Sequence, residues 1–297
     1  MTAIIQCKNL THSYGKRLIY ENLNFEVPKG RILGLLGKNG TGKTTTINIL
    51  SGFLKPQSGE CRIFGHNIQS MPASFRAQIG LLIEGHVQYQ FMTIEQIERF
   101  YSQCYPKWKK EAYYELIRKL KVAPKQRISC MSCGQRSQVA LGLILAQDPE
   151  LLILDDFSLG LDPGYRRLFV DYLRDYASSE NKTVFLTSHI IQDMERLIDD
   201  CIIMDYGKIL LQKPIKELLE TIRCYQFETE DQHVIERLAQ DNELYHPEKI
   251  GQKIELFSFL PKEALAQKME KISINYNNIV STQVNLEDAF IGLTGKY

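Results

Sequence analysis

Alternating hydrophobic and polar positions predict β-strands in the first 80 residues of the chain. In residues 23–27, Leu, Phe and Val alternate with Asn and Glu, the period-2 pattern of a strand buried on one face. Residues 58–65, which contain Gly59 and Gly65 near their ends, are interpreted as another short strand bounded by turns. Residues 79–83 are almost wholly apolar, which predicts a strand buried on both faces.

Between residues 93 and 128 the hydrophobic period lengthens to that of a helix. Apolar side chains recur every three or four positions, so each helix presents one buried face. The residues assigned to these faces are Ile94, Ile97, Phe100 and Tyr101 in one helix and Tyr114, Leu116, Ile117 and Leu120 in a later one.

The middle of the chain alternates strands with a helix. Apolar runs at 151–154 and 183–186 flank an amphipathic helix at 167–176, and this alternation predicts parallel strands in an α/β fold. Two further runs, 201–204 and 209–211, are separated by a turn sequence and read as a hairpin.

After Pro214 the elements become shorter, starting with a helix at 215–222. We expect strands near 224–228, 253–259 and 278–284, and helices near 232–240, 262–271 and 286–293. We therefore divide the chain into residues 1–215 and a small α+β domain at 216–297.

The composition is typical of a globular protein of two units. The 297 residues are 44% hydrophobic and 24% charged. The net charge of +1, from 36 basic and 35 acidic residues, excludes a protein that binds nucleic acid through bulk charge, so we expect no nucleic-acid partner. No apolar run approaches the roughly 18–20 residues of a membrane span, and residues 1–8 match neither a signal peptide nor an acylation motif.

The seven cysteines are dispersed along the chain, as expected of reduced thiols inside a cell. Cys130 and Cys133 form a C-x-x-C pair. A zinc site of this kind needs a second pair, which the sequence lacks, and a redox motif remains an alternative.

The strongest chemical signal is a loop of the pattern G-x-x-x-x-G-K-[ST] between an apolar strand and a helix. The predicted nucleotide-binding residues are Gly37, Lys38, Asn39, Gly40, Thr41, Gly42, Lys43, Thr44 and Thr45. Glycines let successive backbone N–H groups point at phosphate oxygens, and the helix dipole adds to this field. The Lys43 ammonium can reach the β- and γ-phosphates, and the Thr44 hydroxyl can bind Mg²⁺.

Two carboxylates follow the apolar run at 151–154. A buried strand there delivers Asp155 beside the phosphate loop, where it can hold Mg²⁺. Asp156 then stands where a carboxylate can orient or deprotonate an attacking water.

Together these motifs resemble the ATP-binding-cassette (ABC) ATPases, and the resemblance covers residues 1 to about 215. Tyr14 matches the aromatic residue that stacks on adenine in that family. The family's signature, usually Leu-Ser-Gly-Gly-Gln, is matched by Met131, Ser132, Cys133, Gly134 and Gln135. Ser132, Gly134 and Gln135 are kept at the start of a helix, where a hydroxyl and an amide can bind a γ-phosphate; the resemblance implies that they act on the nucleotide of a second subunit.

Two more segments complete the order of motifs. Residues 160–162, ending in Asp162, match the loop that crosses the dimer interface of the family. His189, at the end of a predicted strand, matches the switch histidine that contacts the γ-phosphate.

The chain departs from the family at two acidic positions. Glu84 stands where the family usually has a glutamine, and Glu is a better Mg²⁺ ligand and a proton acceptor; a glutamate here resembles bacterial subunits that export peptide antibiotics. Asp156 replaces the usual catalytic glutamate. Its carboxylate lies roughly 1.5 Å further back, which predicts slow hydrolysis and a rate that Asp156→Glu raises or leaves unchanged.

The segment at 284–295 resembles the C-terminal ending of ATPase subunits of drug and polysaccharide exporters. The resemblance as a whole implies an α/β P-loop core with a mixed sheet and flanking helices, an antiparallel β subdomain and a helical subdomain at about 86–137. It further implies ATP and Mg²⁺ as cofactors, a dimer of two such chains, and a separate permease that holds them at the cytoplasmic face of the cell membrane, with export as the direction.

Three alternatives remain. A non-transport ABC protein would need two fused cassettes or a long coiled-coil insert, which this chain lacks. A catalytically weak or regulatory ABC-type ATPase would explain Asp156 and Cys133. A redox or metal protein would use the C-x-x-C pair.

Overall fold

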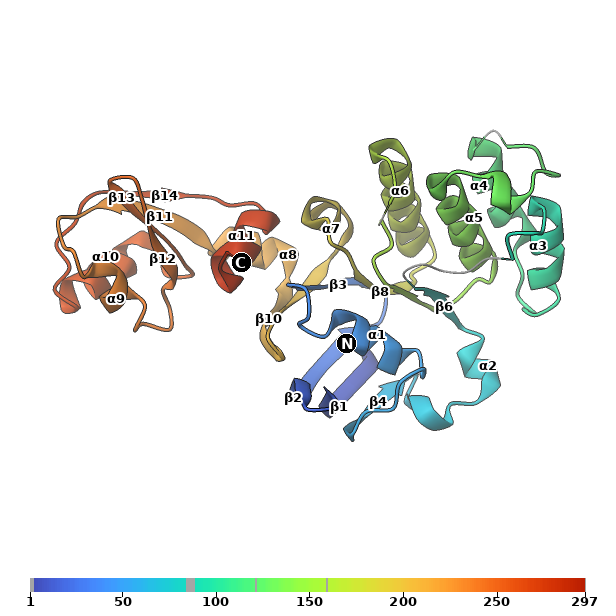
Figure 1. Cartoon of the computed structure of the whole chain (residues 1–297), viewed down its shortest axis with the longest axis horizontal. Helices are drawn as coiled ribbons and strands as arrows, with labels where there is room; N and C mark the ends of the chain where they lie inside the picture. Colours follow the sequence, from blue (N-terminus) through green and yellow to red (C-terminus); the bar gives the residue numbers. More distant parts are fainter. Residues whose placement is uncertain (1–2, 84–88, 121, 159, 297) are drawn as a thin grey trace. The chain divides into compact units, whose positions relative to one another are not determined.

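The computed structural model of the protein describes residues 3–83, 89–120, 122–158 and 160–296. They form two compact units, Met1–Gln212 and Lys213–Tyr297, which we describe separately (Figure 1). The units divide close to position 215, where the sequence pattern changes.

The first unit contains two sheets. The four-stranded sheet has the order β2-β1-β4-β5 and the six-stranded sheet the order β10-β9-β3-β8-β7-β6. The strands are β1 (Ala3–Tyr14), β2 (Arg17–Pro28), β3 (Ile32–Gly37), β4 (Ser58–Ile63), β5 (His66–Asn67), β6 (Ile79–Leu82), β7 (Leu151–Leu154), β8 (Thr183–Thr187), β9 (Asp200–Asp205) and β10 (Lys208–Pro214).

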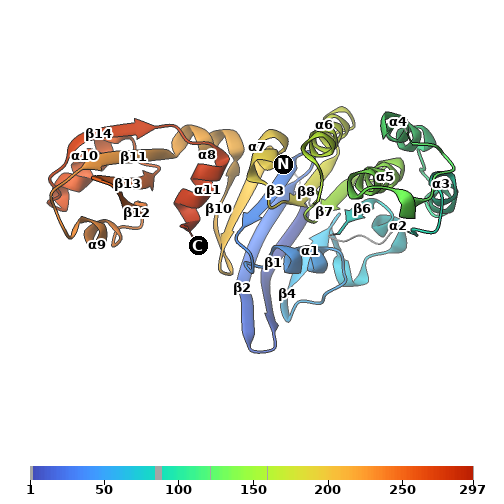
Figure 2. The same ribbon diagram turned by 45° about the horizontal axis from the view of Figure 1, so that its top comes forward.

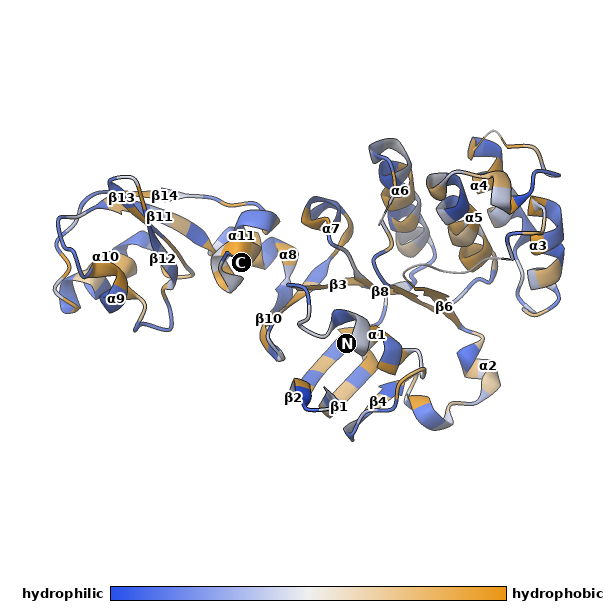
Figure 3. Cartoon of the chain, viewed as in Figure 1, coloured by the Kyte–Doolittle hydropathy of each residue, from blue (hydrophilic) through white to orange (hydrophobic). Residues whose placement is uncertain are grey.

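The two sheets differ in the direction of their strands, as the sequence predicts. Neighbours in the small sheet pair antiparallel, and β9, β3, β8, β7 and β6 pair parallel. The β7 and β8 strands are buried along their whole length, whereas β2 buries alternate residues from Leu23 to Val27. Figure 3 shows this contrast as continuous orange in β3 and β8 against banding in β1 and β2.

The helices of the first unit are α1 (Lys43–Leu50), η1 (Ile68–Ser70), α2 (Ala73–Arg76), α3 (Ile94–Ser102), α4 (Lys110–Leu120), η2 (Ile128–Cys130), α5 (Cys133–Ala146), α6 (Pro163–Ser179) and α7 (Ile191–Leu197). Helix α1 lies between the two sheets and contacts β3 and β4, while α5, α6 and α7 lie on the other side of the large sheet (Figure 1, Figure 2). One hydrophobic core therefore joins both sheets to α1.

The predicted buried face of α3 is wrong at Phe100. Ile94 and Ile97 are buried, but Phe100 is exposed and meets the ring of Tyr89 edge to face. Glu98 is buried instead, because it lies one helical turn after Ile94 and accepts a hydrogen bond of 2.9 Å from Trp108 Nε1. A charged residue thus occupies a core position, which its residue type does not suggest in the sequence.

The strand predicted at 79–83 is present as β6, but the expectation that both faces are buried is wrong. The β6 strand is the edge of the sheet, so Ile79 and Leu81 are only partly buried. Apolar continuity therefore does not distinguish an edge strand from a central one here.

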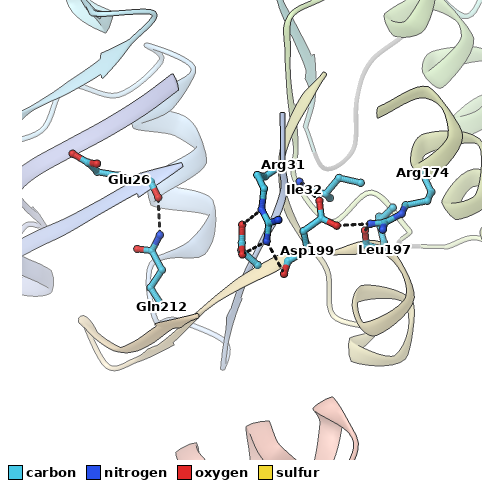
Figure 4. Close-up of polar contacts among 8 residues, drawn as sticks. Glu26, Arg31, Ile32, Arg174, Leu197, Asp199 and Gln212 are labelled. Carbon is cyan, nitrogen blue, oxygen red and sulfur yellow. Dashed lines mark hydrogen bonds and ion pairs between the residues drawn. The ribbon is translucent and has the colours of Figure 1, made fainter. Parts of the chain in front are cut away.

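Arginines close the amino ends of the parallel strands (Figure 4). The Asp199 carboxylate accepts hydrogen bonds of 2.9 Å from the Ile32 amide and from Arg174, and Asp200 forms an ion pair with Arg31. The hydrogen bond to Asp200 raises the pKa of Arg31. These contacts tie the starts of β3 and β9 to α6.

The second unit is a small α+β domain, as the sequence predicts. Its elements are α8 (Ile215–Thr221), β11 (Arg223–Glu228), α9 (Val234–Leu238), β12 (Tyr245–Ile250), β13 (Lys253–Ser258), α10 (Lys262–Lys271), β14 (Asn277–Thr282) and α11 (Leu286–Thr294). The strand order β12-β13-β11-β14, with a helix after β11 and another after β13, is the ferredoxin-like arrangement. The sequence reading missed β12, an edge strand that contains Pro247 and a left-handed residue, His246.

Candidate functional site

The phosphate loop forms between β3 and α1, as the motif predicts. Gly42 caps α1 at its N-terminus with a φ of 105°, which favours glycine. A Cβ atom on Gly42 would come within 2.8 Å of Ile19 and 2.9 Å of Tyr20. Both the backbone conformation and the close approach of β2 therefore require glycine at this position.

The Lys43 side chain folds back along the loop. Its Nζ donates to the carbonyl oxygens of Gly37 at 2.6 Å and Lys38 at 3.1 Å, and Thr41 Oγ1 also donates to Lys38 at 2.9 Å. Burial lowers the pKa of Lys43, although the charges of Asp156 and Asp155 act in the opposite direction. The ammonium is thus held at the centre of the loop, near both carboxylates.

The carboxyl ends of β7 and β8 supply those carboxylates. Asp155 Oδ1 accepts a hydrogen bond of 2.6 Å from the Thr187 hydroxyl, and the same oxygen of Thr187 accepts the backbone N–H of Asp156 at 3.0 Å. All three residues are buried. Asp156 has a φ of 46°, the left-handed conformation that few residues other than glycine, asparagine and aspartate adopt.

His189 faces Asp156 from the end of β8. Its Nε2 lies 2.7 Å from Asp156 Oδ2, so the Nε2–H group donates to the carboxylate. The His189 side chain is 43% exposed and that of Asp156 only 4%. The imidazole therefore lies between the buried carboxylate and the solvent.

Lys43, Asp156 and His189 line one open pocket of about 440 Å³. Its lining residues are Tyr14, Arg17, Ile19, Asn39, Gly40, Gly42, Lys43, Thr44, Thr45, Asp156 and His189. Half of Tyr14 is exposed, which leaves a ring face available for stacking. The structure thus brings together the phosphate loop, the aromatic residue, the second aspartate and the histidine that the sequence singled out.

Sequence reasoning missed Arg17 and Thr187. Arg17 starts β2, and its Nη2 lies 2.8 Å from where a Cβ atom on Gly40 would stand. A cation three residues after Tyr14 was the available signal for Arg17. For Thr187 the signal was a hydroxyl two residues before His189.

The signature residues do not line this pocket. Ser132 caps α5: its hydroxyl accepts the Gln135 N–H at 3.2 Å, and the Gln135 side chain accepts the Ser132 N–H at 3.0 Å. A Cβ atom on Gly134 would lie 2.7 Å from the Tyr165 ring. Ser132 is exposed and Gln135 is half-buried, and Asp162 at the N-cap of α6 is also exposed.

Two further predictions are the role of Glu84 and the binding of Mg²⁺. Glu84 lies outside the described residues. In the parts of the chain that the structure describes, no group of three or more His, Cys, Asp or Glu residues is arranged to hold a metal ion. Mg²⁺ needs no such cage, because it takes few protein oxygens and keeps water and phosphate ligands. The Thr44 hydroxyl and the Asp155 carboxylate fit that hard-oxygen chemistry.

Comparison with known proteins identifies the family. The sequence model described as "ABC transporter" matches residues 20–158. The bacitracin transport ATP-binding protein BcrA of Bacillus licheniformis is 31% identical over 99% of this chain and 98% of its own length. The Nod factor export ATP-binding protein I of Cupriavidus metallidurans is 30% identical over 100% and 99%.

The chain belongs to the ABC transporter ATP-binding family. The expected family and the expected ATP cofactor are confirmed, and the chain is an ATPase subunit of an ABC transporter.

Solved structures share the ABC ATPase fold. An ATP-binding subunit of an ABC transporter has a TM-score of 0.64 and 24% identity, covering 73% of this chain and 92% of that one. A dimeric ATP-binding cassette in a post-hydrolysis state with ADP and Pi has a TM-score of 0.62 and 20% identity, covering 71% and 98%. None of the helices in the described residues is long and apolar enough to span a bilayer.

Proposed function

We propose that two copies of this chain form two composite ATP sites and that their closure powers export through a separate permease. One observation carries the proposal. The pocket gathers the phosphate loop, Asp156 and His189, but the signature residues Ser132 and Gln135 lie outside it, and Ser132 is exposed to solvent. A second copy would supply its own signature to this open pocket.

The residues that the sequence singled out have distinct roles in this proposal. The Tyr14 ring stacks on adenine, and the loop amides with Lys43 bind the phosphates. Thr44 and Asp155 would hold Mg²⁺, which would supply positive charge to the phosphates. The sequence also supports a role for Glu84 in this proposal, as a further Mg²⁺ ligand or as a proton acceptor.

Hydrolysis needs a water aligned with the γ-phosphate. The Asp156 carboxylate accepts a proton of that water and orients it, and His189 donates to the γ-phosphate when the nucleotide is bound. Their mutual contact of 2.7 Å places acceptor and donor at one point of the pocket wall. The partner's Ser132 hydroxyl and Gly134 amide then bind the γ-phosphate from the opposite side, and Asp162 lies in the loop at the interface.

Export is supported by the names of the relatives. They include a bacitracin transport protein, a Nod factor export protein and the linearmycin resistance protein LnrL of Bacillus subtilis, which is 27% identical over 99% of both chains. We infer a cargo of the antibiotic type, moved by a permease that binds the ATPase dimer at the cytoplasmic face of the membrane. Residues 216–297 form an accessory domain of this subunit.

A catalytically weak, regulatory ATPase is the second candidate. The replacement of glutamate by Asp156 and of glycine by Cys133 favours it. The two functions differ in turnover, since a regulatory subunit binds ATP without sustained hydrolysis.

The variant Ser132→Arg tests the composite site. We expect ATP hydrolysis by the full chain to be abolished, because the bulky cation blocks the partner's γ-phosphate. Nucleotide affinity, measured by fluorescence titration of the same preparation, should stay within about twofold of wild type, since Ser132 lies outside the chain's own pocket. Parallel loss of binding and turnover would contradict the proposal.

A further inference from the structure

The Thr187 hydroxyl joins the two aspartates at the point where β7 leaves the sheet. Leu154 pairs with Leu186, so Thr187 lies one residue beyond the last β7–β8 pair. Asp155 still donates its backbone N–H to Leu82 across the sheet at 2.7 Å. Asp156, two residues after the end of β7, donates its N–H to a side chain instead, that of Thr187.

The backbone of Asp156 needs this partner. Its φ of 46° is costly for a residue with a Cβ atom and persists only where the surroundings impose it. The residue is buried, and a buried N–H without an acceptor is strongly disfavoured. The Thr187 oxygen at 3.0 Å satisfies the amide in this conformation.

Thr187 is itself oriented by the first aspartate. Its one hydroxyl proton is donated to Asp155 Oδ1 at 2.6 Å, so the oxygen lone pairs are directed at the Asp156 amide. One residue later, the hydroxyls of Ser188 and Ser158 lie 2.9 Å apart. The ends of β7 and β8 are thus joined by two successive hydroxyl contacts.

The consequence appears at His189, two residues after the end of β8. His189 Nε2 meets Asp156 Oδ2 at 2.7 Å, so the end of β8 holds Asp156 by its backbone through Thr187 and by its carboxylate through His189. The left-handed backbone of Asp156 changes the direction in which its carboxylate points. In a glutamate, the additional methylene would move the carboxylate instead.

We propose that Thr187 is a positioning residue for ATP hydrolysis, whose hydroxyl holds the left-handed backbone of Asp156 and so aims its short carboxylate at the attacking water. The inference rests on the proposed role of Asp156. Thr187 itself is not among the residues that line the pocket.

The test compares Thr187→Val, which keeps the shape and removes the hydroxyl, with Thr187→Ser, which keeps the hydroxyl. In the full chain, Thr187→Val should lower kcat on the order of 10- to 100-fold, with KM for ATP within about twofold. Thr187→Ser should retain most of the wild-type kcat. If Thr187→Val does not fold, Thr187→Ala against Thr187→Ser makes the same comparison.

A mutant cycle separates positioning from a structural role. In the Asp156→Asn background, Thr187→Val should lower kcat no more than about twofold further, because the group that it positions is already lost. The ring resonances of His189 in ¹H–¹⁵N spectra give a second readout. Thr187→Val should shift them towards those of Asp156→Asn, and Thr187→Ser should not.

Three results would overturn the inference. They are a wild-type kcat in Thr187→Val, an equal loss in Thr187→Ser and Thr187→Val, and full additivity with Asp156→Asn. Failure of the proposed function looks different, because wild type and Lys43→Ala would then share the same background rate. Active wild type with inactive Lys43→Ala and unaffected Thr187→Val would remove only the inference.

Discussion

The six-stranded sheet carries two Asp-Asp pairs, one at each end of its parallel strands. At the amino edge, Asp199 and Asp200 are bound by Arg174 and Arg31. At the carboxyl edge, Asp155 and Asp156 are contacted by the hydroxyl of Thr187 and by His189, and Asp156 lines an open pocket. The same dipeptide thus serves two purposes.

The difference lies in what surrounds the carboxylates. A bidentate guanidinium neutralises a carboxylate and fixes it, which makes the Arg31–Asp200 pair a structural clamp. A hydroxyl and an exposed imidazole orient a carboxylate without neutralising it, and so leave its charge available to a ligand. Of the two pairs, only the one at the carboxyl edge is therefore suited to chemistry.

The largest expected effect is on the rate of ATP hydrolysis, which should depend on the carboxyl edge and not on the amino edge. Asp156→Asn should lower the ATPase kcat by about 100-fold or more while nucleotide affinity persists, and should trap an ATP-bound dimer detectable by size-exclusion chromatography. The matched control is Asp200→Asn, which makes the same chemical change at the other edge. Its kcat should remain within about twofold of wild type. Equal kcat in wild type and Asp156→Asn would shift the water-positioning role to Glu84 or His189.

The second prediction concerns the stability of the fold and the ion pair at the amino edge. Arg31→Met leaves Asp200, which is 8% exposed, beside Asp199 without its cation. We expect the free energy of unfolding to fall by about 2 kcal/mol, less than for a fully buried pair because 32% of the Arg31 side chain is exposed. Urea denaturation measures it, with Asp156→Asn as the control, which should lower the free energy of unfolding by less than Arg31→Met does, because asparagine keeps the shape of aspartate and an acceptor for His189. The reverse ranking would contradict the division between clamp and site.

The smallest expected effect concerns the length of one side chain. Side-chain length alone predicts that Asp156→Glu speeds hydrolysis, or at least does not slow it. The structure predicts a several-fold slower rate, because glutamate tolerates the φ of 46° less well than aspartate and its added methylene displaces the carboxylate from His189. Steady-state ATPase rates of the two proteins decide the question. A faster variant would show that the geometry of the carboxyl edge does not favour aspartate over glutamate at position 156.

The phosphate loop could be predicted because consecutive residues determine its geometry. The loop from Gly37 to Thr44 needs only its own glycines and the neighbouring strand and helix, so the motif determines the structure. Tyr14 and His189 were found through the order of motifs along the chain, and the structure places both in the same pocket as the loop.

The rest depends on tertiary contacts that no local pattern records. The left-handed Asp156, the bridging Thr187 and the approach of Arg17 to Gly40 join segments about 20 to 30 residues apart. In the same way, buried Glu98 and the edge strand β12 escaped prediction because neighbours, not residue type, determine their places.

A mixing experiment tests the composite site most directly. Lys43→Ala and Ser132→Arg chains should each be inactive alone, the first through its own pocket and the second through its partner's. In a mixed dimer, one site combines an intact phosphate loop with an intact signature. An equal mixture should therefore recover ATP hydrolysis up to about a quarter of the wild-type rate, since half of the dimers are mixed and each has one of its two sites intact. A mixture that stays as inactive as its components would contradict a site shared between two copies of this chain.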